Sequence, residues 1–426
     1  MSVISAPRGT RDLLPADEPA WEWLHSAHVR VAGAHGYRLV ETPMFEATEL
    51  FERGIGAGTD VVDKEMYTFS DRGGRSLTLR PEGTPAVLRA ALSAHLEQDH
   101  RPVRLRYAGP MFRYDRPQAG RYREFHQLGI ECIGEGSPEL DVEVIEVGWA
   151  LFTTLGLAGV NLQVNSLGDL DDRRRYRAAL VAYYTPLREQ LCEDCRRRLT
   201  INPLRLLDCK RDAGLVAAAP EIAASLSDDT RAYFRRVLDG LTAAGVQHTV
   251  NARLVRGLDY YAHTTFEFWH TSLQGAQNAL GGGGRYDGLA EMLGFPPTPG
   301  VGYALGTERI LLVAQEQGLT PGPDSTATVV VASVGAGQAG AAAVVARELR
   351  GGGLTVVLDT AERKLERKLR SADRLGASLC CIVGEDEAAV DGVALRDLRS
   401  HTQTSLSRID LVAAVRAALA PIGALQ

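Results

Sequence analysis

The hydrophobic positions near the start of the chain first follow a helical period and then the period of a strand. Between residues 17 and 36 they recur every three or four positions, at Trp21, Leu24, His28, Val31 and Ala32. The next four residues, 37–40, are typical of a strand. Residues 70–90 predict a hairpin, a strand and the start of a helix, with Thr84 as N-cap before Pro85.

Residues 109–131 predict two strands joined by a basic loop. Arg113 ends the first strand, and further arginines crowd the turn marked by Pro117 and Gly120. In the second strand the positions alternate, at Phe125, Gln127, Gly129 and Glu131. Strand alternation resumes after 254 and includes Thr-Phe-Glu-Phe-Trp at 265–269.

Between about 171 and 250 the strand patterns give way to arginine-rich helical segments. The arginines cluster at 173–175, 196–198 and 235–236. This composition predicts a helical insertion at 171–250 within a domain formed by 1–170 and 251–320. Its cationic faces could contact a polyanion, or they could be solvated surfaces of a spacer.

A second domain is predicted at 327–426, after a linker at 321–326 that begins with Pro-Gly-Pro. Strands at 328–334, 354–359 and 378–384 alternate with helices at 339–350 and 363–376 and with a last helix from 409. The second helix is expected to bury Leu365, Leu369 and Ala372. Its cationic residues are expected to point mostly outward; they are Arg363, Lys364, Arg367, Lys368 and Arg370.

The first strand-to-helix turn of this domain carries a pattern typical of dinucleotide binding. Gly335, Gly337 and Gly340 have the required spacing, and Asp359 ends the next strand about 20 residues later. However, about 100 residues cannot supply a second nucleotide-binding half and a substrate domain. A nicotinamide-linked enzyme is therefore the rival hypothesis, and we interpret the glycines as easing a tight turn.

Composition and charge limit the classes of function. The chain has 426 residues, 45% of them hydrophobic and 23% charged, which is typical of a globular protein with two or three domains. Its formal charge of -6 means that any RNA contact must use local basic patches. The start of the chain lacks a secretory pattern, and the uncharged stretch 327–346 is interrupted by glycines. We expect a cytoplasmic protein with no membrane partner.

The cysteines are expected to be reduced. Cys192-x-x-Cys195, with Cys209 nearby, has some resemblance to a zinc site, but only one further cysteine follows the first pair. The expectation is therefore structural thiols and no metal site.

The arginines of the loop at 113–123 suggest a site for a ligand with several phosphate groups. A guanidinium fork suits phosphate oxygens better than an ammonium does. The chain contains no Gly-x4-Gly-Lys-Ser/Thr loop, so phosphate binding must come from side chains such as Arg113. The alternative is a solvated hairpin whose arginines only keep an exposed edge of the sheet soluble.

Several segments, in order along the chain, resemble the histidine–tRNA ligases, which are class II aminoacyl-tRNA synthetases. The segments are Pro-Arg-Gly-Thr-Arg-Asp-Leu-Leu-Pro at 7–15, Thr-Leu-Arg-Pro-Glu-Gly-Thr at 78–84, the Arg-rich segment at 109–131, Leu-Val-Arg-Gly-Leu-Asp-Tyr-Tyr at 254–261 and Gly-Thr-Glu-Arg-Ile at 306–310. The resemblance implies an α+β catalytic domain with an antiparallel sheet and a helical insertion, followed by an α/β anticodon-binding domain. It also implies a homodimer with Pro43 at the centre of its interface. A second alternative is the synthetase-like regulatory subunit of ATP phosphoribosyltransferase, which lacks the anticodon domain.

The resemblance further implies ATP-dependent ligation of L-histidine to tRNA(His), with Mg²⁺ accompanying ATP. By matching position, Arg113 contacts the α-phosphate, Arg121 the β- or γ-phosphate and Arg309 the γ-phosphate. Arg256 would bridge the substrate carboxylate and the α-phosphate, where other class II enzymes use a metal ion.

The family pattern also assigns residues to histidine itself. Glu131 and Tyr261 match the residues that bind the ring nitrogens. The α-amino group is assigned to Glu82, Thr84 and Gln127, with Tyr260 beside them. A site that hydrogen-bonds both ring nitrogens rejects apolar amino acids, because they would leave its polar groups unpaired.

Overall fold

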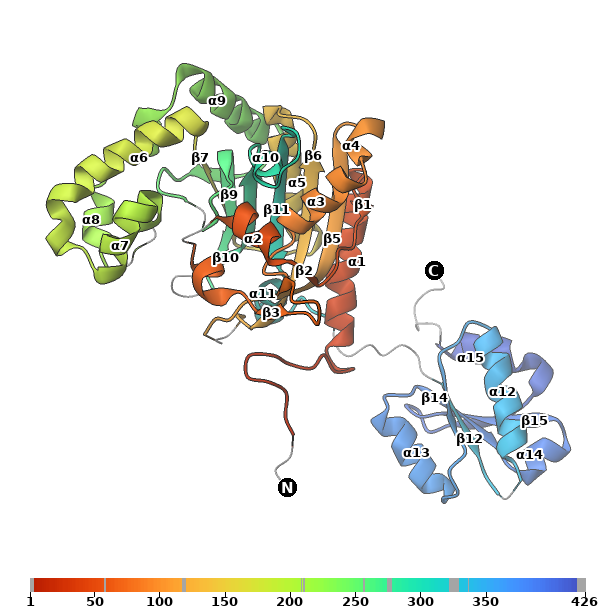
Figure 1. The fold of residues 1–426 in the computed structure, drawn as a ribbon. Helices are drawn as coiled ribbons and strands as arrows, with labels where there is room; N and C mark the ends of the chain where they lie inside the picture. The colour runs from red at the N-terminus through yellow and green to blue at the C-terminus, as the bar shows by residue number, and fades with distance from the viewer. Residues whose placement is uncertain are drawn as a thin grey trace. The chain divides into compact units, whose positions relative to one another are not determined.

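The protein is seen in a computed structural model that describes residues 4–56, 59–116, 120–207, 209, 211–255, 257–273, 278–321, 329–335 and 337–419. The chain divides into two compact units, Met1–Pro321 and Gly322–Gln426 (Figure 1). Each unit has its own main sheet and its own hydrophobic core.

The first unit is built on a large, mainly antiparallel sheet. Its strands are β1 (Arg38–Leu39), β5 (Val103–Phe112), β6 (Glu124–Ile133), β7 (Val160–Ser166), β8 (His248–Val250), β9 (Ala262–His270), β10 (Ala279–Arg285) and β11 (Gly300–Gly306). Within the described residues they form one eight-stranded sheet in the order β1-β5-β6-β11-β10-β9-β7-β8. Only the two edge pairs, β1 with β5 and β7 with β8, run parallel. The predicted antiparallel sheet is confirmed.

A small second sheet and a set of helices complete this unit. β2 (Phe45–Ala47), β3 (Thr68–Ser70) and β4 (Ser76–Leu79) pair in the order β2-β4-β3. The helices are α1 (Glu18–Ala34), α2 (Thr48–Ile55), α3 (Thr84–Ser93), α4 (Leu96–Asp99), α5 (Pro138–Thr154), α6 (Leu170–Tyr184), α7 (Glu193–Ile201), α8 (Ala213–Ala217), α9 (Asp228–Ala243), α10 (Leu289–Met292) and α11 (Thr307–Glu316). Short turns of other helix types lie at Val61–Glu65, Thr185–Gln190, Pro203–Leu206 and Ile222–Ser225.

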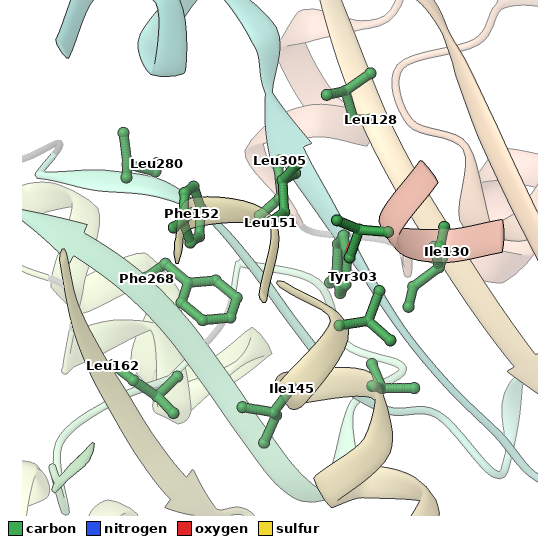
Figure 2. Packing of buried hydrophobic residues seen from close by; sticks show 14 of the residues in the cluster. Leu128, Ile130, Ile145, Leu151, Phe152, Leu162, Phe268, Leu280, Tyr303 and Leu305 are labelled. Atoms are coloured by element: carbon green, nitrogen blue, oxygen red, sulfur yellow. The ribbon is translucent and has the colours of Figure 1, made fainter. Parts of the chain in front are cut away.

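The main core lies on the face of the sheet that α1, α5, α9 and α11 cover. Figure 2 shows Leu151 and Phe152 of α5 beside strand residues such as Phe268 and Tyr303. The rings of Phe152 and Phe268 meet edge to face, with centroids 5.1 Å apart. The predicted helix at 17–36 contributes Leu24 and Ala32, both fully buried. Burial of such apolar surface is the main force that holds the helices on the sheet.

The stretch 171–250 is mostly helical, from α6 to α9, and Figure 1 shows α6, α7 and α8 projecting beside the β7 edge of the sheet. It also contains β8, which extends the sheet next to β7. Tyr176 and Leu180 of α6 share a core with Val87 and Leu88 of α3 and with Tyr261. The partition into a catalytic domain at 1–170 and 251–320 and an insertion at 171–250 stays a prediction.

The expectation that Thr84 caps a helix is wrong. α3 has Gly83 at its N-cap, and Thr84 and Pro85 occupy the first positions of the helix. The Thr84 hydroxyl donates instead to the carboxyl of Glu131, at 2.7 Å. The hydroxyl therefore donates to a tertiary acceptor, whereas a capping hydroxyl would accept from a local backbone N–H.

The second unit is an α/β domain with a mixed sheet. Its strands are β12 (Val329–Ser333), β13 (Val356–Asp359), β14 (Leu379–Val383), β15 (Gly392–Asp397) and β16 (Gln403–Ser407), in the order β13-β12-β14-β15-β16. The helices are α12 (Ala339–Gly351), α13 (Leu365–Arg374), α14 (Glu385–Ala389) and α15 (Arg408–Leu419). β12 lies parallel to β13 and β14, whereas β15 and β16 are antiparallel. The hairpin of β15 and β16 was not predicted.

Two residues of this unit behave differently from the sequence-based expectation. Lys368 was expected to point outward, but it is 1% exposed, and its Nζ donates to the carbonyls of Ser333 at 2.6 Å and Asp359 at 3.0 Å. The Asp359 carboxylate, which a dinucleotide site would use for a ribose, accepts from Arg363 at 2.6 Å. The polar groups at the ends of β12 and β13 therefore have Lys368 and Arg363 of the same unit as their partners.

Candidate active site

An open cavity of about 860 Å³ lies over the middle strands of the first unit's sheet. Most of the predicted site residues line it together, although they come from distant parts of the chain. They are Glu82, Thr84, Arg113, Arg121, Gln127, Tyr261 and Arg309. Glu131 and Tyr260 lie outside this lining and contact it from behind.

Three arginines concentrate positive charge in this cavity. Arg113 follows β5 and lies over the ring of Phe125, and its Nε donates to the carbonyl of Pro81 at 2.8 Å. Arg309 of α11 donates from Nη1 to the carbonyl of Ala279 at 2.7 Å. Burial lowers the pKa of Arg309, and the nearby charges of Arg121 and Arg113 lower it further. Guanidinium groups remain charged under these conditions, so the cavity attracts a polyanion.

The loop between β5 and β6 holds Arg121 in place with an acidic residue. Arg121 forms an ion pair with Asp115, which also lines the cavity. Burial lowers the pKa of Arg121, Glu65 opposes this effect, and Arg113 adds to it. Pro117 and Ala119 in the same loop lie outside the described residues.

Acidic and amide groups also belong to the lining of the cavity. Glu82 is 4% exposed and accepts a hydrogen bond from the Tyr260 hydroxyl at 2.9 Å. Gln127 lines the cavity, and its side-chain oxygen is buried without a hydrogen-bond partner in the part of the chain that the structure describes. A buried amide oxygen without a partner is costly, so a ligand donor would be favoured there.

Glu131 is a fully buried carboxyl with three hydroxyl neighbours. Thr84 donates to its Oε1 at 2.7 Å, Tyr286 donates to its Oε2 at 2.6 Å, and Tyr107 approaches at 3.5 Å. Burial raises the pKa of Glu131 to about 8, although the hydrogen bonds from Thr84 and Tyr286 act to lower it. The folded protein therefore holds this carboxyl close to the point where it exchanges a proton near neutral pH.

Tyr107 and Tyr286 were not predicted as parts of the site. Tyr107 lies between the backbones of Gly83 and Gly129, where an added Cβ on either glycine would collide with its ring. Tyr286 follows the glycine-rich strand β10. The alternation of β5 gives one signal, since it places Tyr107 on the inner face with Leu105 and Val103.

The two neighbouring tyrosines before β9 have separate surroundings. Tyr261 lines the cavity, whereas Tyr260 hydrogen-bonds to Glu82 and lies edge to face with Tyr286. Their own ring centroids are 4.6 Å apart. The two rings therefore have different partners although the residues are adjacent in the sequence.

Arg256 lies outside the described residues. The residues on either side of it, Val255 and Gly257, both line the cavity. The Gly257 carbonyl accepts a hydrogen bond from Arg205 at 2.8 Å. These two flanking residues thus border the same cavity as the other predicted residues.

The arginine-rich helical stretch reaches this segment directly. Arg173 of α6 donates to the carbonyls of Tyr261 at 2.9 Å and Asp259 at 3.0 Å. Asn202 donates to the Asp259 carboxylate at 2.6 Å. These side chains therefore support the cavity wall from behind. The guanidinium of Arg173 donates to backbone carbonyls of the protein and is not simply a solvated surface group.

Two further polar residues in the cavity were missed. Glu267 on β9 accepts a hydrogen bond from the indole of Trp269 at 2.7 Å, and both line the cavity. The alternation of 265–269 was the signal for Glu267 and Trp269, because Phe266 and Phe268 between them face the core. Glu308 also lines the cavity, and both of its oxygens accept from the backbone N–H of His126 at 3.0 Å.

The glycines of strand β10 could let the backbone approach a substrate closely. Gly281 does line the cavity. However, an added Cβ on Gly281 or Gly283 would collide with the backbone of β11, and one on Gly284 with the ring of Tyr261. The glycines therefore also allow close contact with the neighbouring strand and with the site's own tyrosine.

The family of the chain is decided by a comparison with family models. The model described as histidyl-tRNA synthetase matches residues 9–170 and 191–310, which is more than half of the chain. The chain belongs to the histidyl-tRNA synthetase family. A second model, described as an anticodon binding domain, matches residues 328–418, so the α/β unit is the anticodon-binding domain of that fold.

Similar proteins cover nearly the whole chain of this histidyl-tRNA synthetase family member. A histidine–tRNA ligase of Geobacillus kaustophilus is 46% identical over 408 residues, covering 95% of this chain and 96% of the relative. One from Dehalococcoides mccartyi is 44% identical and covers 97% and 99%. The solved structure of apo S. aureus histidyl-tRNA synthetase matches with a TM-score of 0.82 at 34% identity, covering 97% of this chain and 100% of that one. The predicted family and fold class are confirmed.

These findings also bear on the rival hypotheses. The match to an anticodon-binding domain and the full-length similarity to ligases favour a ligase over the regulatory subunit of ATP phosphoribosyltransferase. The Arg363 partner of Asp359 and the mixed sheet of the second unit give no support to a dinucleotide enzyme.

Proposed function

We propose that the chain ligates L-histidine to tRNA(His), using ATP to form a histidyl-adenylate and releasing AMP and diphosphate. The observation that carries the proposal is the gathering of Arg113, Arg121 and Arg309 in one cavity with Glu82 and Gln127. ATP supplies a chain of negative phosphates, and histidine supplies an ammonium group. The cavity offers groups of the opposite charge to both.

The chemical step needs alignment and charge neutralisation more than it needs a protein nucleophile. An oxygen of the histidine carboxylate forms a bond to the α-phosphorus, and the bond from that phosphorus to the β-phosphate oxygen breaks, so diphosphate leaves with the electron pair. In the second step a ribose hydroxyl of the tRNA attacks the carbonyl carbon, loses its proton, and AMP leaves. Fixed cations around the phosphorus stabilise the charge that develops in the first step.

The phosphate contacts are proposed by matching position. Arg113 would contact the α-phosphate, Arg121 the β- or γ-phosphate and Arg309 the γ-phosphate, with Mg²⁺ entering as part of the ATP substrate. Arg256, which lies outside the described residues, would bridge the carboxylate and the α-phosphate. The mutual repulsion of the first three arginines supports this, since a polyanion would relieve it.

The histidine contacts are proposed in the same way. Glu82, Thr84 and Gln127 would hold the α-amino group, and the buried carboxylate of Glu82 is the natural partner of an ammonium. Tyr261 and Glu131 would bind the two ring nitrogens, and Tyr260 would orient Glu82. Because Glu131 is 0% exposed, one of its hydroxyl partners would have to give up its place to the ring.

The proposed homodimer is supported by exposed apolar residues near Pro43. Leu39, Met44, Phe45 and Phe69 are between 44% and 59% exposed, and the rings of Phe45 and Phe69 lie 6.3 Å apart. Large apolar side chains grouped on a surface mark an interaction site. Sedimentation equilibrium should give twice the chain mass, and Phe45→Asp should lower it; a monomeric wild type would contradict this proposal.

The cytoplasm is the proposed location. None of the described helices is long and apolar enough to cross a membrane. For tRNA, the exposed arginines of the helical stretch, such as Arg174 and Arg235, and the anticodon-binding domain are the proposed contacts.

Isotopic exchange between diphosphate and ATP in the presence of histidine tests the phosphate assignments. Arg113→Ala and Arg309→Ala should each lower kcat for exchange by about 10²-fold or more, because each removes a fixed cation at the reacting phosphates. Arg72→Ala provides the matched control, since Arg72 is exposed in the β3–β4 turn. Unchanged exchange in both active-site variants would refute these roles.

A further inference from the structure

Four potential metal ligands that take no part in the proposed histidine and ATP contacts meet in the helical stretch. One ligand atom from each of Cys192, Cys195, Cys209 and Asp212 lies within 4.8 Å of all the others. All described cysteines have free thiols. The sequence alone favoured structural thiols because only one cysteine followed the first pair. The fold supplies an aspartate as the fourth member.

The ligands come in two pairs with the same spacing. Cys192 and Cys195 are separated by two residues, and so are Cys209 and Asp212. Cys192 is the N-cap of α7, and Asp212 is the N-cap of α8. Two close pairs that approach each other across a short connection are the arrangement found in structural zinc sites, where Asp can replace one Cys.

The distances fit a tetrahedral ion better than a disulfide. The Sγ atoms of Cys192 and Cys209 are 3.7 Å apart. Two thiolates at ~2.3 Å from one Zn²⁺, at the tetrahedral angle, would be separated by about 3.8 Å. A disulfide would require a sulfur–sulfur distance of about 2 Å.

The surroundings of Asp212 add an independent observation. This carboxylate is 9% exposed and accepts the backbone N–H of Cys192, at 3.2 Å and 3.1 Å for its two oxygens. No ion pair to Asp212 is formed among the described residues. A carboxylate held among thiols in this way is oriented as a metal ligand is by its outer hydrogen bonds.

We propose that Cys192, Cys195, Cys209 and Asp212 bind one Zn²⁺ ion as a structural site. Soft thiolates with one carboxylate in a closed tetrahedron favour Zn²⁺ over Mg²⁺ or Ca²⁺, which prefer oxygen ligands.

The proposed ion would brace the wall of the cavity. Cys209 itself lines the cavity, as does Leu207 two residues earlier. The segment between the two ligand pairs contains Asn202 and Arg205, which hold Asp259 and the Gly257 carbonyl. Zinc would thus fix the segment that carries these contacts, although it would not touch the substrates.

Metal analysis of the full-length protein tests the site. After anaerobic purification with added Zn²⁺ and desalting, the wild type should hold one zinc per chain. Cys195→Ser and Asp212→Asn should lose most of it, whereas Cys380→Ser, a buried cysteine of the other unit, should retain it. Zinc-free wild type, or equal zinc in the ligand variants and the control, would overturn the proposal.

Cobalt substitution of the wild type gives a second measurement that does not depend on the folding of variants that lack a ligand. Co²⁺ in the wild type should give the thiolate-to-metal charge-transfer band and the intense visible bands of tetrahedral coordination. Asp212→Cys should keep these bands and strengthen the charge transfer. Weak octahedral bands only, or a Cys192–Cys209 disulfide found by mass spectrometry of unreduced protein, would contradict a zinc site.

Discussion

Replacing Glu131 by glutamine tests whether burial keeps the carboxyl group behind the cavity lining protonated. Glutamine keeps the shape of the side chain and can still hydrogen-bond the hydroxyls of Thr84, Tyr107 and Tyr286, because each hydroxyl can donate or accept. The substitution removes the ionisable group. Burial raises the pKa of Glu131 from 4.5 to about 8. This difference, at ~1.4 kcal/mol per pH unit, makes ionisation in the folded protein cost on the order of 5 kcal/mol.

The sign of the effect follows from proton linkage. Between pH 4.5 and about 8 the folded chain keeps the Glu131 proton, whereas the unfolded chain has released it. Each pH unit in this window therefore lowers the wild type's free energy of unfolding by ~1.4 kcal/mol relative to the glutamine variant. Below the window the difference is constant, and above it the full penalty has been reached.

Denaturant unfolding of the first unit, at several pH values across this window, measures the effect. The glutamine variant should gain stability relative to wild type as pH rises. Glu22→Gln is the control, because Glu22 is exposed on α1, and its difference from wild type should stay flat. Parallel pH curves for wild type and Glu131→Gln would refute the reasoning.

Three further substitutions test buried contacts within the two units. Arg285→Met should destabilise the first unit by about 3–5 kcal/mol in denaturant unfolding, because it leaves the fully buried Asp141 without its cation; Arg235→Met, at an exposed position, should have little effect, and equal losses would contradict this. Lys368→Met should lower the calorimetric melting temperature of the second unit, because the buried carbonyls of Ser333 and Asp359 lose a donor; an unchanged transition would contradict that. Gly129→Ala should destabilise the first unit by about 1–3 kcal/mol and weaken histidine binding in calorimetry, because its Cβ would displace the Tyr107 ring; wild-type affinity would count against it.

Long periodic segments made much of the fold predictable. The helix at 17–36 and the strands around 109–131 matched α1, β5 and β6, because one face of each packs on the core. The hairpin β15 and β16 was missed because β16 is mostly exposed and carries the polar sequence Gln-Thr-Ser-Leu-Ser. The orientation of Lys368 was wrong because helical periodicity does not register a cation that has buried carbonyl partners.

The site was predictable mainly through residues carried over by position from a resembling family. The burial of the site residues and their hydrogen-bond partners could not be predicted by matching position. Alternation places Tyr107 on the inner face of β5, but the contacts of Tyr107 and Tyr286 with Glu131 could not be predicted, because they depend on the pairing of distant strands. The place of Asp212 beside the cysteines was hidden for the same reason, since an aspartate is common on helix N-termini.

The central claim is that one cavity activates histidine with ATP, and amino-acid-dependent isotopic exchange into ATP tests it most directly. The full chain should incorporate label from diphosphate into ATP when L-histidine is present, and should show only background exchange with each of the other standard amino acids. Exchange that is absent with histidine, or equally fast with another amino acid, would contradict the account.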